Sequence, residues 1–504
     1  MRKKSGALKL AAVVAVAGLT VAACGDDSSS GGATTTAGAT TTAGATTTAG
    51  GGGSGSSWCA DPIDTSLDAK SGTGAGWQKW VIECAAKKPL VAAGDSVVIG
   101  LQNPEGDPAG TFPEYSKAAQ AAVEFINKEL GGFGADYKTG KPGRPVKLEV
   151  CKMAINPADS TKCANELAAK KPFAVYSTLN FFGNHFPIYQ QAKIPVLVGT
   201  PITVADFTGE GVFAIGGGGG CLGVHTGLIE LATSNLKGKR VAVPWSDTPP
   251  GVFCYHDLEK KPLRILAGKT DGDAAVKGKI PGLEDIGVPI KPATPDVTPQ
   301  VQQVLDFKPD VIVYSAQGAD CWNFVNTATK LGWTPSKTPL VLSGACIDLN
   351  KIKEAGDSAK GIYFVGATPI TTPQDLPAGL LKDQATVYVN KMKQYGAGEE
   401  FTKGFATQGF LGLMLMHAVA NDLANGDAAK LTGDAFLASM KATKNRHAFA
   451  GTPVGCADTD STYKAVCNST VTATQWDGAK YNVIREGYSG VYLVKNSKID
   501  TGQG

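Results

Sequence analysis

From residue 97 onward, short runs of β-branched and other apolar residues alternate with segments in which apolar residues recur at helical spacing. In one such segment, Ala118, Ala121, Ala122, Phe125 and Ile126 fall on one face of a helix. In this first series we expect strands at 97–101, 146–150, 173–176 and 194–198, and helices at about 114–130, 157–170 and 184–191.

A second series of the same kind follows residue 216. We expect helices at about 222–235, 299–307 and 320–331, and strands at 240–244, 311–314 and 340–342. Strands separated by helices in this rhythm predict parallel sheets covered by helices on both faces. The stretch from Trp58 to the end of the chain is too long for one hydrophobic core, so the two series predict two α/β lobes.

The N-terminus has a different pattern. Arg2, Lys3 and Lys4 precede an apolar run at 8–23, which is too short for a membrane span and is typical of a cleaved signal peptide. The run ends in VAAC and resembles a bacterial lipobox, which implies cleavage after residue 23 and diacylglycerol on the sulfur of Cys24. The alternative is an ordinary secretory signal with an incidental cysteine. Either interpretation predicts a protein that works outside the cytoplasm.

Residues 24–57 contain, after the cysteine, only Gly, Ser, Thr, Ala and two Asp, and ATTTAG is repeated within them. Such a segment cannot bury enough apolar surface to offset the entropy of ordering, so we expect a disordered tether. A flexible chain of this length spans roughly 30 Å. It would hold a globular body close to a membrane, and residues 58–90 would form an N-terminal extension of that body.

The formal net charge of +3 includes Arg2, Lys3, Lys4 and Lys9, which leave with the signal peptide. The mature chain is therefore nearly neutral, which argues against nucleic acid or anionic lipid as its main partner. The five His are scattered and there is no close CxxC pair, so we expect no metal site and no cofactor.

Cysteine usage fits an oxidising compartment, because setting Cys24 aside from the eleven cysteines leaves an even number. Spacing alone leaves the connectivity open. The remaining thiols fall into neighbouring pairs, and we expect bridges within these pairs: Cys59 with Cys84, Cys151 with Cys163, Cys221 with Cys254, Cys321 with Cys346, and Cys456 with Cys467.

Several stretches of the body resemble one family in consistent order. GLQNPEGDPAG and TFPEYSKAAQAAVEFINKELGG resemble the first strand, ligand loop and first helix of type I periplasmic substrate-binding proteins, the leucine/isoleucine/valine-binding group of ABC importers. The stretch that begins EVCKMAINPADSTKCANELAAKK is similar to the family's next units, and VQQVLDFKPDVIVYSAQGADCWNFVNTATKLGW to a second-lobe unit. The resemblance covers about residues 97–423.

The resemblance implies an α/β fold of two doubly wound parallel-sheet lobes, joined by hinge strands and closing on a small molecule. On this basis we expect 91–213 and 366–480 to form lobe 1, and 214–365 and 481–504 to form lobe 2.

Ligands of open α/β sheets bind beyond the carboxyl ends of the strands, where loops and helix N-termini converge. The loops that meet this condition are 102–112, 177–182, 199–203, 245–251 and 317–320. By resemblance, Asn180 lies near the family's ligand-binding serine and Thr203 lies on its threonine. Phe112 lies near the aromatic residue that packs on the ligand, and Gln317 or Gly318 lies near the second-lobe aromatic residue. The full set of candidate ligand-binding residues is Asn103, Phe112, Ser177, Asn180, Phe181, Thr203, Trp245 and Gln317.

One departure from the family bears on the ligand. Amino-acid binders of this group hold the α-ammonium with an acidic side chain after a second-lobe strand, whereas the matching stretch 343–346 here contains no acid, and the first acid is Asp348. A buried ammonium without an anion is costly. The ligand is therefore not expected to be a standard amino acid, and neutral amides, carboxylates and aromatic compounds remain open.

The resulting hypothesis is a lipid-anchored, extracytoplasmic solute-binding protein that delivers a small polar organic ligand to an ABC permease. A ligand-sensing receptor component is the first alternative, and a secreted envelope enzyme on an α/β scaffold is the second. The sequence contains no GxSxG and no HExxH, so we expect no enzymatic activity.

Overall fold

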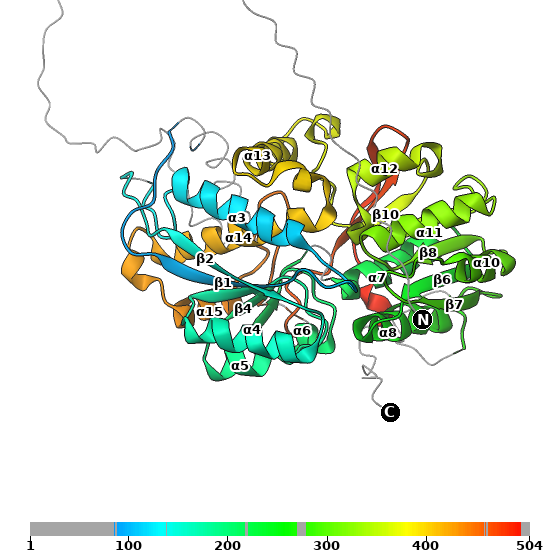
Figure 1. The fold of residues 1–504 in the computed structure, drawn as a ribbon, viewed down its shortest axis with the longest axis horizontal. Helices are drawn as coiled ribbons and strands as arrows, with labels where there is room; N and C mark the ends of the chain where they lie inside the picture. The colour runs from blue at the N-terminus through cyan, green and yellow to red at the C-terminus, as the bar shows by residue number, and fades with distance from the viewer. Residues whose placement is uncertain are drawn as a thin grey trace, which may run out of the picture. The chain divides into compact units, whose positions relative to one another are not determined.

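A computed structural model describes residue 85 and residues 88–137, 139–216, 220–269, 279–457, 459 and 462–494. The predicted signal peptide, the lipidation site Cys24, the tether and the pair Cys59 and Cys84 lie outside these residues. Within the described ranges, no helix is both long and apolar enough to cross a membrane. Two mainly parallel sheets with helices on both faces confirm the predicted two-lobe α/β fold (Figure 1).

The first sheet is wholly parallel, with strand order β2-β1-β3-β4-β5. Its strands are β1 (Val97–Pro104), β2 (Val146–Met153), β3 (Ala174–Ser177), β4 (Val196–Val198) and β5 (Val212–Ala214). Its helices are α3 (Pro113–Lys128), α4 (Pro157–Ala169), α5 (Phe186–Gln191), α6 (Val204–Thr208), α13 (Leu380–Gln394), α14 (Gly404–Ala424) and α15 (Gly433–Ala442).

Alternate residues of these strands belong to different cores. Ala174 and Tyr176 of β3 pack in the cluster that contains α3 and α14, whereas Val175 between them packs in the cluster with α4 and α5. The same alternation separates Leu197 from its neighbours in β4. Figure 1 shows α3 and α14 on one face of the sheet and α4 and α5 on the other. Every residue of β3 and β4 is buried, and all of them are apolar apart from Tyr176 and Ser177, whose hydroxyls are hydrogen-bonded.

The second sheet has strand order β12-β11-β10-β9-β8-β6-β7. Its parallel part is extended by β11, which runs antiparallel to β10, and by β12, which runs antiparallel to β11. Its strands are β6 (Arg240–Ser246), β7 (Glu284–Ile290), β8 (Val311–Tyr314), β9 (Leu340–Ser343), β10 (Tyr363–Gly366), β11 (Val471–Trp476) and β12 (Tyr481–Tyr488). The α-helices of this lobe are α7 (Cys221–Glu230), α8 (Pro249–Tyr255), α9 (Lys261–Leu266), α10 (Thr298–Asp306), α11 (Ala319–Lys330) and α12 (Leu349–Ala355).

Short helical segments complete the chain. Two are π-helical and continue α-helices: η2 (Leu231–Asn235) follows α7, and η3 (His256–Lys260) lies between α8 and α9. The others are 3₁₀ turns, namely η4 (Gly344–Cys346), η5 (Gly356–Ser358), η6 (Pro373–Asp375), η7 (Gly398–Thr402), η8 (Ala428–Lys430) and η9 (Val491–Leu493).

The chain passes to the second sheet after β5, returns to the first lobe after β10, and enters the second sheet again with β11. The expected boundary placed residues up to 480 in lobe 1. In the structure, β11 pairs with β10 and with β12, so the second sheet resumes at Val471. The difference arises because β11 is an antiparallel addition, and its place in a sheet depends on long-range pairing with Tyr363–Gly366.

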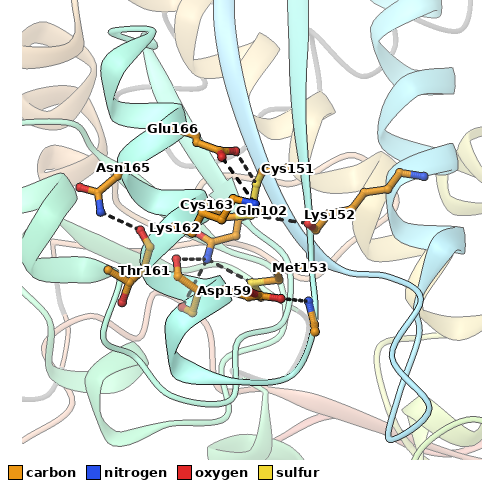
Figure 2. Close-up of a disulfide and its surroundings, with 12 residues drawn as sticks. Gln102, Cys151, Lys152, Met153, Asp159, Thr161, Lys162, Cys163, Asn165 and Glu166 are labelled. Atoms are coloured by element: carbon orange, nitrogen blue, oxygen red, sulfur yellow. Dashed lines mark hydrogen bonds and ion pairs between the residues drawn. A yellow bond between two sulfur atoms is a disulfide. The ribbon is translucent and has the colours of Figure 1, made fainter.

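Four of the five expected disulfides lie within the described residues, and all four pairings are confirmed: Cys151 with Cys163, Cys221 with Cys254, Cys321 with Cys346, and Cys456 with Cys467. Figure 2 shows the first of them, which joins β2 to α4 beside the buried amide of Gln102. The Gln102 Nε2 donates to the Ser160 carbonyl oxygen (3.1 Å) and to Met153 Sδ (3.2 Å) in the same corner.

The bridge between Cys321 and Cys346 closes a loop with a sequence separation of 25 residues and joins α11 to η4. We predict that replacing both cysteines by serine lowers the free energy of unfolding by about 3 kcal/mol, because the unfolded chain regains the entropy of the open loop. Urea unfolding of the oxidised proteins measures this. Equal stabilities of the double variant and the parent protein would contradict the prediction.

Candidate ligand-binding site

A cavity of about 120 Å³ lies where loops from both sheets meet. Ser246, Ser343 and Gly366 line it from the carboxyl ends of β6, β9 and β10. Thr200 lines it from the loop after β4, and Phe405 from the first turn of α14. The cavity therefore lies at the carboxyl ends of the strands, which is where parallel α/β sheets usually bind their ligands.

The polar side chains that line the cavity are hydroxyls, carboxamides and one imidazole, that of His225. The hydroxyls and carboxamides belong to Thr200, Ser246, Thr248, Ser315, Gln317, Ser343, Thr368, Thr371, Thr407 and Gln408. Among the lining residues that the structure describes, there is no Lys, Arg, Asp or Glu. The apolar part includes two phenylalanines, Phe181 and Phe405, and the disulfide between Cys221 and Cys254. The arrangement can hold a small molecule that is partly apolar and partly hydrogen-bonding.

Hydrogen bonds from the first lobe fix Gln408. Its Oε1 accepts from the hydroxyls of Tyr115 (2.7 Å) and Thr200 (2.6 Å), and these two hydroxyls lie 2.6 Å apart. Tyr176 donates to the backbone oxygen of Gln408 (2.7 Å). Burial raises the pKa of Tyr115 well above its ordinary value, so the phenol keeps its proton and can donate. Because Oε1 of Gln408 already accepts two hydrogen bonds, its Nε2 group is the end of the carboxamide that can donate to a ligand.

The second lobe contributes His225 from α7, beside a buried acid. The Nδ1 of His225 lies 3.1 Å from Oε1 of Glu259, and the hydroxyl of Ser315 donates to the same oxygen. Glu259 belongs to η3 and is fully buried, whereas His225 and Ser315 line the cavity. The carboxylate therefore lies one side chain behind the wall and holds both residues in place.

The phenylalanine at the start of α14 has aromatic support. Phe405 stacks on Tyr115, with ring centroids 5.6 Å apart, and meets Phe112 edge-on at 5.3 Å. Phe112, a predicted contact residue, is buried behind Phe405 and is not among the residues that line the cavity.

Of the eight candidate residues, Phe181 and Gln317 line the cavity. Three others are fully buried in hydrogen bonds to the protein. Asn103 donates to the Phe112 carbonyl oxygen (2.8 Å), Ser177 contacts His185 Nε2 (3.2 Å), and Asn180 donates to Ser160 Oγ (2.9 Å). These side chains hold the loops that follow β1 and β3 in position.

The last two candidates also have structural contacts. Thr203 caps α6: its hydroxyl accepts from the Asp206 backbone N–H, and Asp206 Oδ2 accepts in return from the Thr203 backbone N–H (2.7 Å). Trp245 stacks on Tyr255 in the core of the second lobe, with centroids 4.9 Å apart. The ligand-binding role of all eight residues stays a prediction.

Sequence reasoning missed Gln408, Phe405 and His225. The loop 199–203 was singled out, and it does supply Thr200 and Ile202 to the cavity. No local sequence signal marks the first turn of α14 as part of the cavity. This turn reaches the cavity only because the chain returns to the first lobe after β10. The stretch 343–345 lines the cavity, and Asp348 caps α12 through bonds from the N–H groups of Asn350 and Lys351.

Comparison with known proteins gives one family and a common fold. The model of the periplasmic binding protein family matches residues 96–480. No curated protein matches the chain. Among solved structures, a branched-chain amino acid ABC transporter protein from Thermus thermophilus with bound valine has a TM-score of 0.63 and 14% identity, covering 80% of this chain and 98% of that one.

Two further structures show the same fold. The branched-chain amino acid transporter substrate-binding protein LivJ from Streptococcus pneumoniae, in complex with isoleucine, has a TM-score of 0.56 and 16% identity, over 78% of this chain and all of that one. A solute-binding protein of an ABC transporter from R. palustris, in complex with 4-hydroxybenzoate, has a TM-score of 0.56 and 19% identity, over 78% and 96% of the two chains.

The cap at Thr203 gives a prediction about stability. Thr203→Ala should lower the free energy of unfolding by about 1 kcal/mol, because α6 loses the oxygen that accepts from its first turn. Thr203→Ser is the matched control, because it keeps that oxygen and should stay close to the parent protein. Urea unfolding of the three proteins provides the measurement, and an alanine variant as stable as the serine variant would refute the capping role.

Proposed function

Because the chain belongs to the periplasmic binding protein family, we propose that it is an extracytoplasmic solute-binding protein for an ABC importer. It captures a small polar organic ligand, such as an amide, a carboxylate or an amino-acid-like compound, in the cavity described above. The observation that carries the proposal is that both lobes line one cavity at the carboxyl ends of their strands. This geometry suits reversible capture, because each lobe supplies only part of the contact.

Binding energy then favours the arrangement in which both lobes contact the ligand. In the first lobe Phe405 offers an apolar surface and Gln408 a hydrogen-bonding group. In the second lobe Gln317 and His225 offer polar groups. A permease can recognise the form in which both sets are engaged, and this links ligand capture to delivery.

Two groups of side chains bear on the enzyme alternative: Ser177 with His185, and Ser315 with His225 and Glu259. Ser177 and His185 are in contact but are fully buried, and burial lowers the pKa of His185 to about 3. At the cavity, Ser315 donates to Glu259, so its proton points at the carboxylate and away from an imidazole base. Neither grouping provides the exposed nucleophile and adjacent base that acyl transfer requires. We therefore propose binding without turnover.

Gln317 provides the test of the site. It lines the cavity, is partly exposed, and makes no side-chain hydrogen bond to another described residue. A thermal-shift screen of small polar organics should yield a stabilising compound. Gln317→Ala should then weaken that compound's affinity about ten- to hundredfold, as expected for a lost hydrogen bond of about 1–3 kcal/mol. Calorimetry measures the affinity.

Gln302→Ala is the control for this experiment, because Gln302 is exposed on α10, bonds only Asp306 there, and does not line the cavity. It should leave the affinity unchanged. An unchanged affinity in Gln317→Ala as well would remove Gln317 from the site. Failure of every compound to stabilise the parent protein would count against the solute-binding role itself.

We also propose that diacylglycerol on Cys24 anchors the protein to the membrane through the tether. Cys24→Ser removes the sulfur that would carry the lipid, so the protein should move from the membrane fraction to the soluble fraction of the envelope. Fractionation followed by blotting measures the distribution. If the serine variant stays in the membrane fraction as completely as the parent, the anchoring proposal is wrong.

A further inference from the structure

The cavity differs from an amino-acid site in its charge. Of its described lining residues, His225 is the sole titratable side chain apart from the bridged cysteines. A ligand carboxylate or ammonium would therefore enter without a fully charged side chain to pair with. Transfer of an unpaired ion from water costs more free energy than transfer of a neutral polar group that can be hydrogen-bonded.

One amide at the start of each of three helices near the cavity is already used within the protein. Helices α7, α11 and α14 all begin at the cavity. In each, an amide at the start of the helix already donates to a protein carbonyl: Cys221 to Pro201 (3.0 Å), Gly318 to Ala345 (3.1 Å), and Gly404 to Ile347 (2.9 Å). These three amides hydrogen-bond to neighbouring loops and are therefore not available to a ligand.

An acidic side chain lies directly behind the cavity wall. Glu259 is fully buried, and its Oε1 is held by Ser315 and lies beside His225, two residues of the cavity wall. Its Oε2 has no hydrogen-bond partner among the residues that the structure describes. A carboxylate in a poorly solvated position acts over several ångströms, because the effective dielectric constant there is far below that of water. When Glu259 is ionised and His225 is neutral, the field of the carboxylate disfavours a second anion in the cavity.

The groups that remain for a ligand are neutral. Gln317 makes no side-chain hydrogen bond within the described residues, and Gln408 has its Nε2 unused. The hydroxyl of Thr371, a residue that is 3% exposed, lies on the lining with no hydrogen-bond partner. Carboxamides and hydroxyls both donate and accept, so they are complementary to a ligand that does the same.

Building on the solute-binding role, we propose that the cavity selects an uncharged ligand with both donor and acceptor groups, a carboxamide or an alcohol. In this proposal Glu259 is the specificity-determining residue that excludes carboxylates. It acts without touching the ligand, through its charge behind His225 and Ser315.

The test compares matched compounds by calorimetry on the full mature protein. The first pair is 4-hydroxybenzamide and 4-hydroxybenzoate, and the second set is isovaleramide, isovalerate and leucine. At least one amide should bind the parent protein about tenfold or more tightly than its carboxylate, a ratio that corresponds to about 1.4 kcal/mol. This comparison needs no variant and so does not depend on how a substitution folds.

The second arm uses Glu259→Gln, which keeps an oxygen that can accept from Ser315 but removes the charge. It should raise the affinity for the carboxylate about tenfold relative to the amide, because the repulsion is gone. Glu284→Gln is the control: it removes one charge from the same lobe, at the exposed start of β7, the opposite end of the strands from the cavity. It should leave the ratio unchanged, and urea unfolding checks that both variants are folded.

The outcomes separate the two proposals. A carboxylate or leucine that binds the parent protein more tightly than the amides overturns the ligand class and leaves the solute-binding role standing. An equal effect of Glu259→Gln and Glu284→Gln overturns the role of Glu259. If no compound of either kind binds at millimolar concentration while the protein is folded, both the ligand class and the binding role proposed for this cavity are refuted.

Discussion

The burial of both faces of the central parallel strands is the constraint on which the rest of the structure depends. A strand such as β3 has apolar side chains on both sides, so helices must cover both faces of the sheet and every connection must cross over it. The carboxyl ends of the strands then all point the same way in each sheet. The cavity lies where these two sets of ends meet, so its place follows from the packing of the sheets.

A second consequence is that residues remote in the chain build one wall. Gln408 stands 208 positions after Thr200, and it is fixed there by Thr200, Tyr115 and Tyr176. In the other lobe, Glu259 orients His225 and Ser315 from a third element. The cavity is thus held by buried polar groups behind it, and the lining residues themselves remain able to bond a ligand.

There is a physical reason why most of the predicted site residues make structural contacts and do not line the cavity. Loops at strand ends contain backbone groups that cannot reach a neighbouring strand, and polar side chains satisfy them. Thr203 does this as a helix cap, and Asn103 by bonding the Phe112 carbonyl. The sequence signal for such a residue, a polar side chain after a buried strand, is the same as that for a ligand contact. Phe181 and Gln317 reached the cavity, and nothing local separates them from the others.

Local pattern determined the strands β1 to β4, β6, β8 and β9, the helices α3, α4, α5, α7, α10 and α11, the two-lobe α/β fold and the four described disulfides, because each depends on hydrophobic periodicity or on cysteines close together in the chain. Only the tertiary structure decided the place of β11, the entry of α14 into the cavity and the position of Glu259 behind its wall. These three depend on contacts between segments far apart in sequence, whose energy appears only when the chain is folded.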